Sequence, residues 1–300
     1  MALLTVARQE FVSSAWQILI CVAACLVATG CRSDNRVVEY ATWLQERCHA
    51  GNGERCTELG GIYDRGDKVA RDDARATALY ALGCKHGDSW GCVNYGMSLE
   101  GGLGTAKDVD AAVTLYRGAC DAGNADGCFK LAALYEGLGP KEYREPVEAV
   151  KYYSRACGHG LAHGCTRLAH LYRAGASTAG RDLAEVTHLY EVACNERDPI
   201  ACLELARMYE AGEAVPPAPG RSEGLVHQAT SELDQECERG ESGQCLLLGV
   251  IYDVGYVILQ NYELATYYYG RSCDLGSPVA CAWAAVEAER PEGGATLGDE

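Results

Sequence analysis

Cysteine is the residue of this chain whose number and spacing point most directly to chemistry. The chain has 17 cysteines in 300 residues, and 14 of them form seven pairs with seven residues between the two members. Cysteines that bind zinc or act in redox motifs are commonly roughly two to four residues apart, and no pair here has that spacing. So many cysteines are also rare in a reducing cytosol. We therefore predict disulfides within these pairs: Cys48 and Cys56, Cys84 and Cys92, Cys120 and Cys128, Cys157 and Cys165, Cys194 and Cys202, Cys237 and Cys245, and Cys273 and Cys281.

The three remaining cysteines lie near the N-terminus, where residues 18–28 form an apolar run. This run fits the hydrophobic part of a signal peptide and falls short of the roughly 20 residues that span a bilayer. Residues 28–31, Ala-Thr-Gly-Cys, resemble the lipobox of bacterial lipoproteins, whose cysteine is acylated after cleavage. We expect a signal peptide over residues 1–30, lipidation of Cys31 and a short linker over 31–36. Cleavage without a lipid is the alternative, and residues 22–25 are a second possible match.

The chain is strongly acidic, with a formal net charge of −16 and a pI near 4.9. Nucleic-acid phosphates and anionic membrane surfaces are bound by clustered Lys and Arg. The charge therefore argues against a nucleic-acid partner and against a polybasic membrane surface. The lipid is then the only membrane contact that we expect, and we expect no cofactor.

The residues before the first cysteine of each pair repeat with the period of a helix. A small residue stands eight positions before this cysteine and a tyrosine four positions before it, as in Ala112 and Tyr116. These positions lie on one stripe of an α-helix, which we expect to be buried. A glycine three residues after the cysteine, such as Gly123, supplies the left-handed conformation that ends the helix. In the fifth pair this residue is Arg197, and we expect Pro199 to make the turn instead.

The second cysteine of each pair begins another helical stripe. Three, four and seven positions after it come a leucine, a small residue and a tyrosine, as in Leu131, Ala132 and Tyr135. The pairs start 36 or 37 residues apart, with one spacing of 43, so the pattern predicts a tandem array of antiparallel helix pairs. We thus predict an all-α fold, an α/α superhelical solenoid of about seven disulfide-stapled repeats over residues 37–288.

The combined pattern is Ala-x3-Tyr-x3-[Ala/Ser/Gly]-Cys-x2-Gly followed by Cys-x2-Leu-[Ala/Gly]-x2-Tyr-x2-Gly. It resembles the Sel1-like repeat, a relative of the tetratricopeptide repeat (TPR). The paired cysteines are similar to those of Helicobacter-type cysteine-rich secreted proteins. The resemblance implies a right-handed α/α superhelix that acts as a scaffold for protein or peptide contacts and is often exported. It also implies a hydrolase alternative, because some disulfide-rich members carry a penicillin-binding or β-lactamase label.

The β-lactamase label can be compared with the residues. A serine β-lactamase needs a nucleophilic serine with a lysine three positions later. No serine in this chain has a lysine at that spacing, and Lys-Thr-Gly is absent. The residues therefore predict no catalytic site and a protein that is not an enzyme. A β-lactamase-like hydrolase remains the alternative through the family label alone, and a purely structural envelope component is a third possibility.

Three histidines are the candidates for a metal site. His159 and His163 flank the glycine turn inside the fourth cysteine pair, and His170 follows on the next helix. They do not share a helix face, their cysteines are assigned to a disulfide, and no carboxylate pattern accompanies them. Zinc sites need about four well-placed ligands. We predict no metal site and expect the turn histidines to be solvated.

A row of polar residues lies opposite the predicted buried stripe of the helices that follow the second cysteines. In the middle repeats these positions hold Lys130, Arg167, His170 and Arg207, together with Glu204. Stacked repeats would bring them together as a partly basic row on an acidic molecule. We predict that this row binds an anionic or C-terminal peptide segment of a protein partner. An ordinary solvated charged face is the alternative.

Two segments depart from the repeat. Residues 213–222 contain three prolines, account for the spacing of 43 residues, and are predicted to be an exposed insertion. Residues 289–300 are rich in glycine and acidic residues, and we predict that they are disordered. The whole pattern is typical of a monomeric array in the bacterial cell envelope, as a periplasm-facing or outer-membrane lipoprotein, or of a secreted protein.

Overall fold

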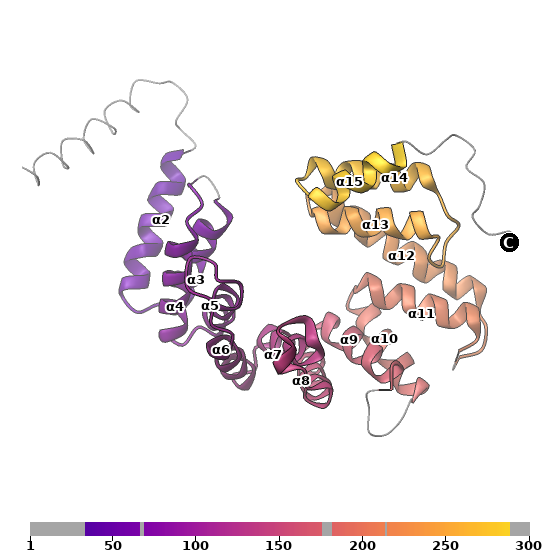
Figure 1. Cartoon of the computed structure of the whole chain (residues 1–300), viewed down its shortest axis with the longest axis horizontal. Helices are drawn as coiled ribbons and strands as arrows, with labels where there is room; N and C mark the ends of the chain where they lie inside the picture. The colour runs from indigo at the N-terminus through magenta and orange to yellow at the C-terminus, as the bar shows by residue number, and fades with distance from the viewer. Residues whose placement is uncertain (1–33, 67–68, 176–181, 214, 289–300) are drawn as a thin grey trace, which may run out of the picture. The chain divides into compact units, whose positions relative to one another are not determined.

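The computed structural model describes residues 34–66, 69–175, 182–213 and 215–288. The predicted signal peptide, Cys31 and the acidic tail lie outside these residues. The chain divides into two compact units, Met1–Ala122 and Gly123–Glu300, and each is described here by itself. The described residues form helices joined by turns and short loops, with no strand among them (Figure 1). This confirms the predicted all-α repeat architecture.

The described residues of the first unit form five helices, each packed against the next (Figure 1). They are α2 (Asp34–His49), α3 (Gly53–Arg65), α4 (Asp73–Lys85), α5 (Ser89–Gly101) and α6 (Val109–Asp121). Helix α2 begins at Asp34, inside the linker that the sequence predicts over 31–36. Asp108 accepts a hydrogen bond from the backbone N–H of Ala111 and so caps α6.

The second unit continues the same alternation (Figure 1). Its elements are α7 (Ala125–Ala133), the π-helical turn η1 (Leu134–Leu138), the 3-10 turn η2 (Lys141–Tyr143), α8 (Pro146–Gly158), α9 (Ala162–Arg173), α10 (Leu183–Asn195), α11 (Pro199–Ala211), α12 (Pro219–Glu238), α13 (Ser242–Val254), α14 (Tyr262–Asp274) and α15 (Pro278–Ala288). Helix α12 begins at Pro219, so the last four residues of the predicted insertion form its first turn. A proline is compatible with that position because the first N–H groups of a helix have no intrahelical partner.

We call the helices that contain the second cysteines the first helices (α3, α5, α7, α9, α11, α13 and α15) and those that end near the first cysteines the second helices (α2, α4, α6, α8, α10, α12 and α14). Their contact depends on the small residue four positions after the second cysteine. A Cβ atom added to Gly60 would lie 2.7 Å from the ring of Tyr80, and one added to Gly249 would lie 2.4 Å from the ring of Tyr269. The small residue therefore makes room for the tyrosine of the next helix.

The predicted disulfides are present. In six pairs the Cα atoms lie 4.4 to 4.8 Å apart, which is within the usual range for a disulfide. Cys120 and Cys128 are disulfide-bonded as well. Each of the six links a second helix to the following first helix across a turn of a few residues. The cysteine spacing therefore predicted the correct pairing.

The turn between the paired cysteines corrects one prediction. Glycines occupy it with a positive φ, as at Gly160 (85°) and Gly240 (98°). In the fifth pair Arg197 takes the same left-handed conformation, with φ of 64°. Pro199 does not make the turn but is the first residue of α11. The expectation was wrong because it assumed that only glycine could adopt the left-handed conformation at this position, whereas Arg197 adopts it as well.

No helix among the described residues combines the length and the apolar character that crossing a membrane requires.

Candidate partner-binding site on the second unit

The tyrosines of the second helices reach a carboxylate on the preceding first helix. The hydroxyl of Tyr153 donates to Oε2 of Glu136 at 2.7 Å. Glu136 stands eight positions after a second cysteine, and the same position holds the acceptor in three other repeats. These contacts are Tyr80 to Asp64, Tyr116 to Glu100, and Tyr269 to Asp253. The buried tyrosine is thus both a packing residue and a hydrogen-bond donor, and the sequence analysis identified only the first role.

Glu136 also links its repeat to the next one. The guanidinium of Arg167, on α9, pairs with both carboxylate oxygens of Glu136, and Nε lies 3.2 Å from Oε2. Arg167 is one of the residues predicted to bind a partner. Its charge is already balanced within the repeat array, and its side chain stays about one-third exposed, at 32%.

The next repeat has the same link with the charges exchanged. Arg173 occupies the position of Glu136, and Glu204, on α11, occupies the position of Arg167. Nη1 of Arg173 donates to Oε2 of Glu204 at 2.7 Å, and Nε of Arg207 lies 3.3 Å from the same oxygen. The other oxygen of Glu204 accepts from the hydroxyl of Tyr256 at 2.7 Å.

Glu204 is therefore the centre of the row. Its side chain is only 16% exposed. Burial by itself raises the pKa of this carboxyl, but the hydrogen bond from Tyr256 and the neighbouring cationic side chains outweigh it and lower the pKa. Arg207 completes the cluster by donating from Nη2 to Glu213 at 3.2 Å.

The exchanged charges leave two buried polar groups poorly paired. The hydroxyl of Tyr190 has no carboxylate acceptor, and the nearby guanidinium of Arg173 opposes the rise that burial causes in its pKa. Nε2 of His170 forms no hydrogen bond and lies 3.9 Å from Oε1 of Glu204. In the other repeats a carboxylate would accept from this tyrosine, but here Arg173 stands in its place. The rings of His170 and Tyr190 meet edge to face, with their centroids 5.7 Å apart. Burial lowers the pKa of His170, which favours the neutral imidazole.

The structure thus brings Arg167, His170 and Arg207 together with Glu204 along α9 and α11. Lys130, on α7, lies partly exposed and acts electrostatically on Asp126, whose pKa is raised by burial and lowered by Lys130 to a smaller extent. The row is balanced in charge rather than basic. The sequence analysis placed Glu204 in the row but missed Glu136 and Glu213, which also balance it. The acidic residue that recurs eight positions after most second cysteines is a signal that could have revealed Glu136.

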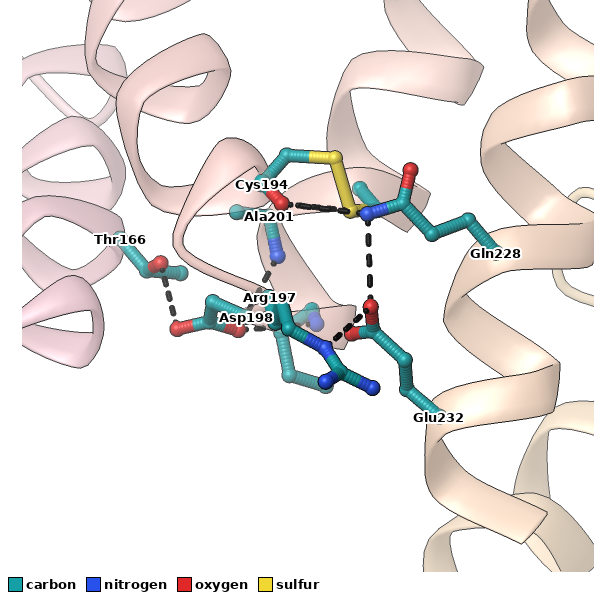
Figure 2. The surroundings of a disulfide bond; sticks show 9 residues. Thr166, Cys194, Arg197, Asp198, Ala201, Gln228 and Glu232 are labelled. Atoms are coloured by element: carbon teal, nitrogen blue, oxygen red, sulfur yellow. Dashed lines mark hydrogen bonds and ion pairs between the residues drawn. A yellow bond between two sulfur atoms is a disulfide. The ribbon is translucent and has the colours of Figure 1, made fainter. Parts of the chain in front are cut away.

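One of the histidines considered for a metal site, His163, has a carboxylate partner. Nδ1 of His163 lies 3.1 Å from Oδ2 of Asp198. Asp198 is 2% exposed, and the same oxygen also accepts a hydrogen bond from the hydroxyl of Thr166 at 2.8 Å (Figure 2). The hydrogen bond to Asp198 raises the pKa of His163. The expectation that no carboxylate accompanies these histidines was therefore wrong, because Asp198 comes from the next turn. The described residues contain no cluster of three or more side chains suited to a metal ion.

A second ion pair lies beside the Cys194–Cys202 disulfide (Figure 2). Nε of Arg197 lies 3.1 Å from Oε1 of Glu232, a side chain that is 10% exposed. Gln228 donates to the same oxygen at 3.4 Å and to the carbonyl oxygen of Cys194 at 3.2 Å. The unusual turn residue Arg197 is thus paired with an unusual buried carboxylate.

These observations define an array of disulfide-stapled helix pairs whose first helices carry a row of ion pairs. The Sel1 repeat model matches residues 56–88, 91–124, 125–161, 199–229 and 245–277, more than half of the chain. The chain belongs to the Sel1 repeat family.

Solved structures agree on the fold. The chain is similar to a Sel1 repeat protein from Oxalobacter formigenes, with a TM-score of 0.58 and 22% identity over 82% of this chain and 97% of the other. It is also similar to the immunity protein PA5088 from Pseudomonas aeruginosa, with a TM-score of 0.50 and 18% identity over 76% and 82% of the two chains. No curated protein matches the sequence. At these identities the likeness shows a shared fold.

Proposed function

We propose that this chain is an exported, lipid-anchored repeat scaffold that binds an anionic or C-terminal segment of a protein partner along α9 and α11. Sel1 repeats are typically protein-interaction modules. The observation that carries the proposal is the row of half-buried ion pairs from Glu136 to Glu213, which presents several guanidinium groups on adjacent first helices.

The disulfides support export. Disulfides persist in oxidising compartments such as the periplasm and the cell exterior, and are rare in the cytosol. With a lipid on Cys31, the repeats would be held at an envelope membrane, in line with the lipobox-like residues 28–31. Intact-mass measurement of the mature protein tests this part, because acylation adds the mass of the lipid and simple cleavage does not.

The mode of binding follows from the charge balance of the row. Arg167 and Arg207 already pair with carboxylates of the chain. A carboxylate of the partner would therefore exchange with Glu136, Glu204 or Glu213 for a guanidinium, instead of meeting an unpaired positive charge. Such an exchange yields little net electrostatic energy, since each exposed pair contributes at most about 1 kcal/mol. Affinity would then depend on several contacts along the row and would fall with salt.

Partner capture followed by mutation tests the proposal. The oxidised repeat array is used as bait in envelope extract, the bound protein is identified by mass spectrometry, and its affinity is measured for the wild type and for the Arg167→Gln/Arg207→Gln variant. We expect about tenfold weaker binding in the variant, from the loss of two charge-assisted contacts. Lys151→Gln is the control, because Lys151 is exposed on α8 and pairs only locally with Glu148. Equal affinity of all three proteins would refute the binding row.

A further inference from the structure

Helix α15 presents an apolar surface that the described residues leave uncovered. Val279, Trp283 and Val286 are 52%, 42% and 64% exposed. Ala282 and Ala285 are exposed between them, so the surface carries no charged side chain at these five positions. Exposed groups of large apolar side chains on a soluble domain mark sites of interaction more often than isolated ones do.

Comparison with the other repeats shows what normally covers such a surface. Ala285 stands four positions after a second cysteine. The equivalent residues are fully buried in the middle of the array, with 0% exposure at Ala132, Ala169 and Ala206. In complete repeats this position lies beneath the following second helix, whose tyrosine ring would contact a Cβ added to Gly60 or Gly249. The repeat geometry therefore assigns the surface of α15 to an amphipathic helix of the second-helix type.

A pocket of about 350 Å³ continues this surface. It is lined by Val250, Asp253, Val254, Tyr269, Trp283 and Val286. The rings of Trp283 and Tyr269 meet edge to face, with centroids 5.4 Å apart, and both line the pocket. The pocket would hold a large apolar side chain of an incoming helix.

The local charge selects among possible helices. Residues 242–288 contain four carboxylates, at Asp253, Glu263, Asp274 and Glu287, and one arginine, at Arg271, which gives a net charge of −3. A second copy of the chain would bring the same negative charge to the contact, on a molecule that carries −16 in total. A helix flanked by Lys or Arg would instead be attracted.

We propose that the exposed face of α15 and the adjoining pocket bind a cationic amphipathic helix of another protein, in the place that a second helix takes in the complete repeats. This surface is separate from the ion-pair row on α9 and α11, and the inference does not rest on the proposed function.

The chain itself supplies matched probes. A peptide with the sequence of α8, residues 146–158, has the small-Tyr-Cys stripe and a net charge of +1; the peptide of α6, residues 109–121, has the same stripe and a net charge of −1. Both are made with amidated C-termini, acetylated N-termini, serine in place of cysteine and a fluorescent label. Binding to the oxidised full-length protein is followed by fluorescence anisotropy.

We expect saturable binding of the α8 peptide, and binding of the α6 peptide that is roughly threefold to tenfold weaker, the range given by two exposed charge contacts. Ala285→Arg should weaken binding of the α8 peptide at least tenfold, because the arginine side chain would cover the apolar surface of α15. Ala184→Arg, at an exposed position of α10, should leave binding unchanged.

Three results of the peptide assay would overturn the inference: no saturable binding of the α8 peptide, binding that survives Ala285→Arg, or tighter binding of the anionic peptide. Sedimentation velocity completes the test. A dimer of the wild type that Ala285→Arg dissociates would assign this face to a second copy of the chain, and a monomer in both proteins supports the foreign helix.

Discussion

The pairing of Arg197 with Glu232 allows a sharp test of how the repeat tolerates two departures from its own pattern. Other repeats place glycine at the turn position of Arg197 and an apolar residue, such as Leu189 or Tyr268, at the position of Glu232, five residues before the first cysteine. Arg197 lies in the turn before α11 and Glu232 lies on α12, yet their side chains are in contact at 3.1 Å. The variants Arg197→Gly, Glu232→Leu and their combination separate the two effects.

The expected energies follow from conformation and burial. A non-glycine residue in the left-handed region costs about 1 kcal/mol, so glycine at residue 197, where φ is 64°, relieves that amount. Arg197 is 66% exposed, so its attraction to Glu232 is screened and contributes about 1 kcal/mol or less. Loss of the guanidinium also leaves Glu232, which is 10% exposed, without its cationic partner, at a cost of roughly 1 to 3 kcal/mol.

Arg197→Gly alone should therefore lower the free energy of unfolding by about 1 kcal/mol. In the Glu232→Leu background the same change should raise it by about 1 kcal/mol, because only the relief of the backbone remains. The coupling between the two sites is then about 2 kcal/mol, well above the error of a double-mutant cycle.

Hydrogen exchange at the amides of α10, α11 and α12 in the oxidised protein is the suitable assay, because a repeat array need not unfold in one step. Urea unfolding followed by circular dichroism gives the same comparison for the whole chain. An equal effect of Arg197→Gly in both backgrounds would show that the ion pair does not compensate for the turn, and the reasoning would fail.

Other predictions concern the tyrosines, pH, the disulfides and catalysis. Tyr153→Phe should lower the free energy of unfolding by about 1 to 2 kcal/mol, since it removes the hydrogen bond to Glu136. Tyr190→Phe should lower it by less, because that hydroxyl has no carboxylate acceptor among the described residues; equal losses in urea unfolding would contradict this. Because Asp198 raises the pKa of His163, the stability from this pair is complete below the unfolded pKa of about 6.5 and is lost as pH rises through the folded pKa, so His163→Gln should remove this part of the pH dependence. Burial lowers the pKa of His170, so its effect on stability has the opposite sign: the free energy of unfolding should fall as pH drops below about 6.5. A His170→Leu variant that loses stability at low pH as much as the wild type would contradict this role of His170. Reduction of the disulfides should abolish the cooperative melting seen by circular dichroism, as each short loop contributes roughly 2.5 kcal/mol, and an unchanged melt with titratable thiols would show that the staples are dispensable. Purified protein should not turn over nitrocefin; turnover that a point change abolishes would favour the hydrolase alternative.

Local sequence patterns were sufficient for the repeat unit. Tyr116 and Ala112 lie on the buried stripe because residues four apart share a helix face, and both are fully buried. Asp182 caps α10 by accepting from the N–H groups of Ala184 and Glu185, as expected for an acidic residue before a helix. These features depend on residues within one or two helical turns of each other.

Contacts between repeats were not predicted. Arg167 was assigned to a partner on the basis of its helix face alone, yet the residue that balances it, Glu136, lies 31 positions away on another helix. The same limit applies to His163, on α9, and Asp198, at the start of α11. A helical period specifies which side of a helix a residue occupies, but not which residue of the neighbouring helix lies opposite to it.

The sequence by itself determined the cysteine pairs, the helix pairs and the buried tyrosines four positions before the first cysteines, because all of these follow from spacings of a few residues. Tertiary structure alone decided that the polar row is balanced by carboxylates, that Tyr190 lacks the acceptor its counterparts have, and that Arg197 adopts a glycine conformation beside Glu232. The physical reason is that charge balance and hydrogen-bond satisfaction depend on how one repeat stacks against the next, and that register is set by packing over the whole helix surface.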